Sequence, residues 1–234
     1  MCCLFLAASS TVAIAQTNVV DLVNPIIGTN GMGHTFPGAC VPFGLVQLSP
    51  DTDTIPHNVD GKYQPRSYEY CAGYQHKDSS IVGFSHTHFS GTGHSDLGDI
   101  LIMPTTGTLK LNPGTATNPD GGYRSRFSHD TEISRPGYYE VMLADYGVKA
   151  QLTTTQRAGI HKYTYPTNSE NQRIILDMIH GIYNYDGKVL WTNIRVENDT
   201  LVTGYRITNG WARTNYTYFA MSFSKPITHY GCEE

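Results

Sequence analysis

The stretch YYEVMLADYGVKAQLTTTQRAGIHKYTY, residues 138–165, alternates apolar and polar side chains along much of its length. In an extended chain, Val141 and Leu143 point to one side and their neighbours point to the other. The same alternation places Val148 and Leu152 on one side. A period of two is typical of antiparallel strands that bury one face. The stretch therefore predicts a run of strands around a hydrophobic core.

Further short segments with turn residues between them continue on both sides of this stretch. The segments expected to be strands are 80–84, 99–103, 107–111, 123–127, 138–143, 148–155, 159–165, 173–178, 188–196, 200–208 and 217–222. A spacing near ten residues is typical of a sandwich, and no segment has the length and period of an ordinary helix. We predict an all-β fold, a large two-sheet β-sandwich.

Composition restricts the classes of partner. The 234 residues include 16 Lys+Arg against 20 Asp+Glu, which gives a net charge of -4, and no basic run reverses this locally. Such a field repels phosphate backbones, so we expect no nucleic-acid partner. Because only 15% of the residues are charged, neutral hydrogen-bonding groups and aromatic rings dominate the polar groups. Neutral sugars pair with surfaces of that kind.

The N-terminus has the features of an export signal. Residues 1–15 are largely apolar and end in Ala13-Ile14-Ala15, a small-x-small pattern that signal peptidase accepts. We predict a signal peptide over 1–15, a β-sandwich domain over 16–234, and a secreted, periplasmic or cell-surface location. A buried N-terminal strand is the alternative. No later stretch approaches the ~20 apolar residues of a membrane span, so none is expected.

The mature chain retains three cysteines. Cys40, Cys71 and Cys232 are an odd number and lack the C-x-x-C spacing of zinc sites. One disulfide and three reduced core cysteines are both open alternatives.

The densest polar cluster is FSHTHFSGTGHSDLGD, residues 84–99. In an extended piece His86 and His88 point to the same side, so both imidazoles could serve one site. Sugar-hydroxyl binding, a transition metal and structural packing are the alternatives, and H-x-H near aspartates is compatible with zinc. Calcium prefers oxygen ligands, which Asp96 and Asp99 could supply.

Two other features flank this cluster. Residues 28–39 are glycine-rich, but no Lys-Ser/Thr follows, so they predict a shaped turn and not a phosphate loop. The aromatic group Tyr68, Tyr70, Tyr74 and His76 suits either sugar stacking or packing. The glutamates are scattered, and no two segments invite the carboxylate pair of a glycosidase, so we expect no catalytic residue in this chain.

Four strings carry a resemblance to a known family. They are VNPIIGT at 23–29, GHTFPGACVPFGLVQLSPDT at 33–52, GFSHTHFSGTGHSDLGDILIMP at 83–104 and RAGIHKYTYP at 157–166. In this order and at this spacing they resemble the N-terminal domain of glycoside hydrolase family 92, whose members are mostly exo-acting α-mannosidases. The similarity extends over about residues 20–230.

The resemblance implies a sandwich of the galactose-mutarotase-like kind. In complete members a C-terminal helical barrel follows, and it supplies the general acid, the general base and most ligands of a calcium ion in an inverting mechanism. The N-terminal domain closes over the barrel mouth and lends contacts to a mannose-containing glycan. We expect the substrate-binding residues to be His34, Phe36, Tyr74, His86, His88, Ser90, Thr92, His94 and Asp96. His94 stands where the family pattern has a small residue.

The leading hypothesis is therefore the N-terminal domain of a secreted, calcium-dependent α-mannosidase whose barrel lies outside this chain. A stand-alone carbohydrate-binding module and a non-catalytic structural lid are the alternatives. We further expect His86 and His88 to face the inter-domain cleft without binding a transition metal. Their replacement by alanine should then lower kcat/KM and leave the fold intact.

Overall fold

The structure is a computed structural model that describes residues 18–53, 55–94 and 96–232. Within these ranges the ordered elements are strands and four short 3-10 helices: η1 (Val19–Leu22), β1 (Ala39–Cys40), β2 (Gln47–Asp51), β3 (Asn58–Val59), β4 (Lys62–Tyr63), η2 (Pro65–Tyr70), β5 (Ser80–Ile81), β6 (Gly83–Ser85), β7 (Leu101–Thr105), η3 (Pro119–Gly121), β8 (Ser125–Arg126), η4 (His129–Thr131), β9 (Ile133–Arg135), β10 (Tyr138–Leu143), β11 (Val148–Thr154), β12 (Gly159–Thr164), β13 (Arg173–Asp177), β14 (Val189–Asn198), β15 (Leu201–Thr208) and β16 (Asn215–Ser222). The predicted all-β fold is confirmed. The predicted signal peptide lies outside the described residues.

Two sheets face one another across the main core. One has the order β1-β2-β6-β7-β13 and the other the order β12-β11-β10-β9. In the second sheet, Val141 pairs with Ala150 and Leu143 pairs with Val148, and all four side chains are fully buried. The alternation in residues 138–165 thus faces the core as predicted. Each such side chain contributes on the order of 1.5–3 kcal/mol relative to an exposed one.

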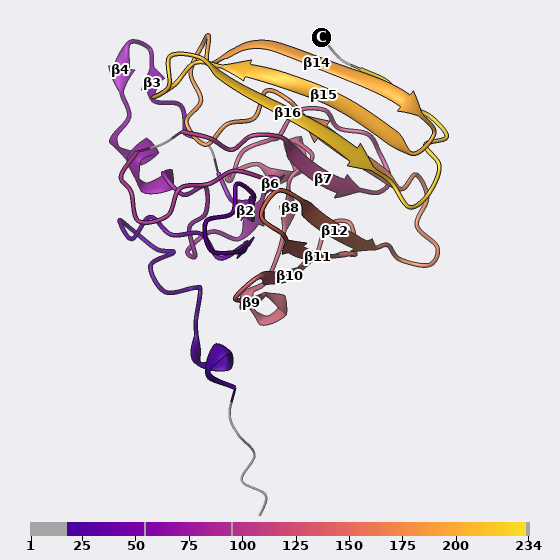
Figure 1. The fold of residues 1–234 in the computed structure, drawn as a ribbon, viewed down its shortest axis with the longest axis horizontal. Coiled ribbons are helices and arrows are strands. Elements are labelled where there is room, and N and C mark those ends of the chain that lie inside the picture. Colours follow the sequence, from indigo (N-terminus) through magenta and orange to yellow (C-terminus); the bar gives the residue numbers. More distant parts are fainter. Residues whose placement is uncertain (1–17, 54, 95, 233–234) are drawn as a thin grey trace, which may run out of the picture.

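A third sheet departs from the two-sheet prediction. Strands β14, β15 and β16 form a separate antiparallel sheet, which lies along one side of the molecule in Figure 1 (orange to yellow). Arg206 of β15 is fully buried and reaches back to the main-chain oxygens of Met178 and His180, at 3.2 and 2.5 Å. The two hydrogen bonds of this buried guanidinium therefore connect the third sheet to the segment after β13.

Three predicted strands differ from the observed ones. One is absent and two have other boundaries, because their backbone groups form local hydrogen bonds outside the expected sheet. Residues 107–111 form no strand, since Gly107 has a positive φ of 72° and bonds to Glu170. Residues 80–84 divide into β5 and β6 at Val82, whose N–H bonds to the Asp51 oxygen. Residues 123–127 keep only β8, because the Tyr123 N–H bonds to the Asn112 oxygen outside any sheet.

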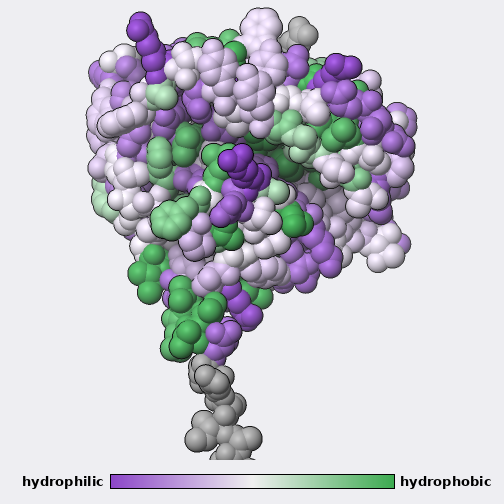
Figure 2. Space-filling model, viewed as in Figure 1, coloured by the Kyte–Doolittle hydropathy of each residue, from purple (hydrophilic) through white to green (hydrophobic). Residues whose placement is uncertain are grey.

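Apolar side chains remain exposed in two places. The segment that follows the undescribed N-terminus extends from the body, and Figure 2 shows its apolar residues gathered there. On the outer face of the third sheet, Trp191, Tyr216 and Tyr218 are all more than half exposed. Among the described residues no helix is long and apolar enough to cross a membrane.

The three cysteines of the described chain are present as thiols. Cys71 is buried, whereas Cys40 and Cys232 are exposed. The alternative of three reduced core cysteines therefore holds for Cys71 alone, because the other two thiols lie at the surface.

Candidate substrate-binding site

The polar motif forms the loop between β6 and β7. Hydrogen bonds hold the two ends of this loop together. The His86 N–H bonds to the Asp99 oxygen at 3.0 Å, and the Gly98 N–H bonds to the Thr87 oxygen at 2.9 Å. The Thr87 hydroxyl also donates to Asp99 Oδ2 at 2.7 Å. These bonds close the base of the loop.

Asp51, at the end of β2, is the centre of the network beneath this loop. Its buried carboxylate accepts from Ser85 Oγ at 2.6 Å, His88 Nε2 at 2.8 Å and His180 Nε2 at 2.7 Å. Gly73 has a positive φ of 79°, and a Cβ there would lie 2.1 Å from Asp51 Oδ1. Only glycine lets that turn approach the carboxylate so closely.

His88 is an imidazolium in this arrangement. Its Nε2 faces the Asp51 carboxylate, and its Nδ1 lies 2.7 Å from the main-chain oxygen of Gln47. Both of these partners are acceptors, so both ring nitrogens donate. Burial opposes ionisation of Asp51, but the charge of His88 and the hydrogen bonds from both histidines outweigh it and hold the pKa of Asp51 below its ordinary value.

His86 belongs to a different chain of hydrogen bonds. Its Nδ1 lies 2.7 Å from the Ile100 oxygen and therefore donates. Its Nε2 then accepts from His161 Nε2 at 3.0 Å, and His161 Nδ1 accepts from the Tyr163 hydroxyl at 2.7 Å. Burial lowers the pKa of His86, and burial together with His86 holds the pKa of His161 well below its ordinary value. Both rings are therefore neutral.

Stability should fall as the pH drops through the range in which unfolded histidines titrate. Below about pH 6.5 the unfolded chain binds protons at His86 and His161, whereas the folded protein does not. At these two rings the unfolded state then binds more protons, so their contribution to the free energy of unfolding should decrease from about pH 7 to about pH 5. Each ring contributes at most about 1.4 kcal/mol per pH unit.

Urea unfolding across this pH range measures how steeply the free energy of unfolding changes with pH. His161→Gln should flatten it, and the matched control His229→Gln, which removes an exposed imidazole near the C-terminus, should not. Equal slopes for His161→Gln and the unsubstituted chain would contradict the assignment.

An exposed surface lies above these buried networks. Phe89 and Ser90 are exposed at the loop tip, and Thr92 and His94 are partly exposed. The ring of Trp211, from the turn between β15 and β16, meets His94 edge-on with centroids 4.5 Å apart and is 78% exposed. The exposed surface at this loop thus includes aromatic rings, hydroxyl groups and an imidazole.

The glycine-rich turn and η2 border the same surface. The Gly91 N–H bonds to the His34 oxygen at 2.6 Å, and the rings of His34 and Tyr68 meet edge-on at 4.9 Å. A Cβ at Gly93 would lie 1.8 Å from the Tyr68 hydroxyl, so a side chain at position 93 would displace the Tyr68 ring. Nε2 of His34 and Nε2 of His94 are buried without a hydrogen-bond partner among the described residues.

Comparison with known proteins decides the family. The model of the glycosyl hydrolase family 92 N-terminal domain matches residues 22–234. The chain belongs to glycosyl hydrolase family 92. A family 92 α-mannosidase from Bacteroides thetaiotaomicron, solved alone and in complex with mannoimidazole, is 46% identical. The comparisons cover 90% of this chain and 26% of that one, with TM-scores of 0.80 and 0.81.

Two more distant relatives are also similar to this chain. The solved family 92 glycosyl hydrolase ccman5 is 25% identical, with a TM-score of 0.66, over 87% of this chain and 26% of its own. An uncharacterized secreted glycosidase of Arthroderma benhamiae is 29% identical over 170 residues, which are 69% of this chain and 19% of that protein. The family 92 domain described here thus spans about a quarter or less of these relatives.

Several expected substrate residues of the family 92 domain lie below its surface. Tyr74 belongs to the hydrophobic core, 1% exposed, and its hydroxyl donates to Glu132. Phe36 is 9% exposed and packs on His88, with ring centroids 5.2 Å apart. The rings of His86 and His88 bond to different partners within the domain, and the expectation that both contact substrate stays a prediction. An extended-chain period predicts a shared side, but not which residues cover it.

Both aspartates of the motif are already paired with cations. Asp96 Oδ1 lies 2.9 Å from Lys188 Nζ, and its Oδ2 accepts from the Trp211 N–H at 2.9 Å. Asp99 Oδ1 lies 2.8 Å from Arg206 Nε. Because each carboxylate has a positive partner inside the family 92 domain, these residues do not fit a calcium site. Asp96 instead positions Trp211.

Sequence reasoning missed Asp51, His180 and Trp211. Asp51 is fully buried. His180 and Trp211 lie in turns far along the chain, and neither carries a recognisable motif. The one available signal is that Asp51 lies within the family string at residues 33–52.

Proposed function

We propose that this chain is the N-terminal domain of an exported exo-α-mannosidase and forms one wall of the cleft that binds the terminal mannose of a glycan. The observation that carries the proposal is the exposed surface at the β6–β7 loop, where the Trp211 ring lies against His94 and where Phe89 and Ser90 are exposed. Sugars offer apolar ring faces and hydroxyl groups, and such surfaces bind both.

The buried networks give this wall its rigidity. Asp51 and Asp99 fix the base of the loop, and Asp96 fixes the turn that carries Trp211. Binding groups on a fixed scaffold lose little conformational entropy when a ligand arrives.

The acid and base of the reaction would come from the rest of the protein. An inverting glycosidase holds two carboxyl groups about 6.5–9.5 Å apart with a water between them. We propose that these carboxylates and the calcium ligands belong to a C-terminal helical barrel. One observation supports this division: Asp96 and Asp99 are each paired with a cation, Lys188 and Arg206.

Calcium and export belong to the same proposal. Calcium would help to hold the sugar hydroxyl groups, while residues of this chain orient the mannose and exclude water from one side. The apolar sequence of residues 1–15, with its small-x-small end, supports a secreted, periplasmic or cell-surface location.

Hydrolysis by the full-length protein tests the function. We expect cleavage of α-mannobiose, with the first product appearing as β-mannose in proton NMR spectra because the mechanism inverts the anomeric centre. Dialysis against chelator should abolish the activity, and calcium should restore it. Failure of the full-length protein to cleave any α-mannoside would overturn the proposal, and retention of the anomer would overturn the inverting mechanism.

Titration of the 234-residue chain with α-mannobiose separates the alternatives. A cleft wall alone should bind only weakly, in the millimolar range. Binding at micromolar sugar, together with an inactive full-length protein, would indicate a stand-alone carbohydrate-binding module instead. An active full-length protein unaffected by changes at the loop surface would indicate a structural lid.

A further inference from the structure

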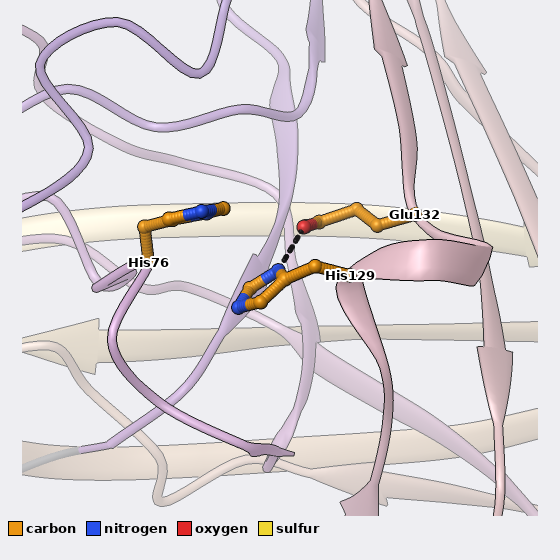
Figure 3. A group of neighbouring side chains, drawn as sticks. All are labelled: His76, His129 and Glu132. Atoms are coloured by element: carbon orange, nitrogen blue, oxygen red, sulfur yellow. Dashed lines mark hydrogen bonds and ion pairs between the residues drawn. The ribbon is translucent and has the colours of Figure 1, made fainter.

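A second cluster of ligating side chains lies where the turn after η2 meets η4 (Figure 3). His76 comes from the turn and is anchored by its N–H to the Thr29 oxygen at 2.8 Å. His129 begins η4, and Glu132 caps its end. Among the described residues, these three side chains offer nitrogen and oxygen atoms that all lie within 4.8 Å of one another.

We propose that His76, His129 and Glu132 bind one divalent transition-metal ion, with zinc the best match to the donors. Two imidazoles and one carboxylate are a donor set that zinc accepts in proteins. Donors about 2.0–2.2 Å from a tetrahedral zinc lie about 3.3 Å from one another. His129 Nδ1 and Glu132 Oε2 are already 2.6 Å apart, so small side-chain rotations would bring the three donors to these distances around one ion.

The histidine pair has nitrogens available for a metal. Nδ1 of His76 is buried and has no hydrogen-bond partner in the described part of the chain. The rings of His76 and His129 stack with centroids 3.9 Å apart and planes inclined by 33°. This stacking places the two imidazoles next to one another, as a single ion bound by both would require.

Two buried phenols hold the carboxylate in place. The Tyr74 hydroxyl donates to both oxygens of Glu132, at 2.9 and 3.0 Å, and the Tyr139 hydroxyl donates to Oε1 at 2.6 Å. Outer hydrogen bonds of this kind orient metal ligands in known sites.

The cluster also offers an entry path. The His129 side chain is 37% exposed, so water can reach the ion and occupy the fourth position. A bound ion would join the turn at His76 to the segment 129–132 at the edge of the sandwich. Because it binds the folded chain and not the unfolded one, it would act as a structural clamp.

Zinc titration of the 234-residue chain tests the site. The exposed thiols are removed first with Cys40→Ser and Cys232→Ser, and the protein is dialysed against chelator. We expect isothermal titration with zinc chloride at about pH 7.5 to show one equivalent with a Kd at or below about 1 µM, and a rise in Tm. Substitution with cobalt should give the visible absorption of a tetrahedral ion.

His129→Gln decides the outcome, because His129 is exposed and its replacement should leave the fold intact. We expect it to weaken zinc binding at least about 100-fold, with the same effect from His76→Gln and no effect from the control His229→Gln. A dissociation constant above about 100 µM for the parent, or equal affinity in the parent and His129→Gln, would overturn the proposal.

Discussion

Asp51→Asn is expected to lower the free energy of unfolding by about 3–5 kcal/mol. The substitution keeps the shape of the side chain but removes the charge that balances the buried imidazolium of His88. It also replaces one acceptor oxygen by an amide that donates, so Ser85, His88 and His180 compete for the single oxygen that remains. An uncompensated charge and an unpaired donor are left in the core.

Urea or thermal unfolding measures this effect. The matched control is Asp60→Asn, which removes the same charge from an exposed hairpin turn. Asp60 has a positive φ of 52°, a conformation that asparagine tolerates well, so the control should change stability by less than about 0.5 kcal/mol. Equal stability of Asp51→Asn and Asp60→Asn would show that the hydrogen-bond network around Asp51 does not stabilise the fold.

The sign of the pH dependence follows from the same carboxylate. Because its pKa in the folded protein is depressed, its contribution to stability is present above the unfolded value of about 3.9 and is lost as the pH falls through the folded value. This loss of stability at acid pH adds to the loss of stability between about pH 7 and pH 5 that arises from His86 and His161.

Trp211→Ala in the full-length enzyme is expected to lower kcat/KM on α-mannobiose by roughly 10- to 1000-fold, about 1.4–4 kcal/mol of transition-state binding. The ring is 78% exposed and lies against His94 at the proposed cleft wall. Its removal takes away a face on which a sugar ring can stack. Stability should barely change, because the ring buries little area and the backbone N–H bond to Asp96 remains.

The second tryptophan of the chain supplies the control. Trp191 is 60% exposed on the outer face of β14–β16, so Trp191→Ala removes a similar exposed ring outside the proposed cleft. Steady-state kinetics and thermal melting of both variants separate the two roles. If Trp211→Ala retains full activity, or if Trp191→Ala loses as much, the placement of the substrate at the β6–β7 loop is wrong.

His88→Ala has a different expected outcome from the one that the motif alone suggests. Alternation in an extended chain predicts an exposed pair, His86 and His88, whose loss leaves the fold intact. The His88 side chain is fully buried against Asp51, so its replacement should destabilise the fold. Any loss of activity would then include a loss of structure, and the exposed Trp211 is the cleaner probe of binding.

The sequence by itself determined the strand pattern, the absence of long helices and the family. Period-two alternation needs only the local geometry of an extended chain, which is why the pattern alone assigns Val141 and Leu143 correctly to the core. The family depends on strings such as residues 83–104, which are read directly from the chain.

Only the tertiary structure decided what each polar side chain does. Asp51 and His180 are 129 residues apart, and Asp96 and Trp211 are 115 apart, yet each pair is in hydrogen-bond contact. Local periodicity says which side of a strand a residue occupies, but the element that covers that side comes from distant parts of the chain. For that reason the same motif contains a buried ion pair at His88 and an open surface at Ser90.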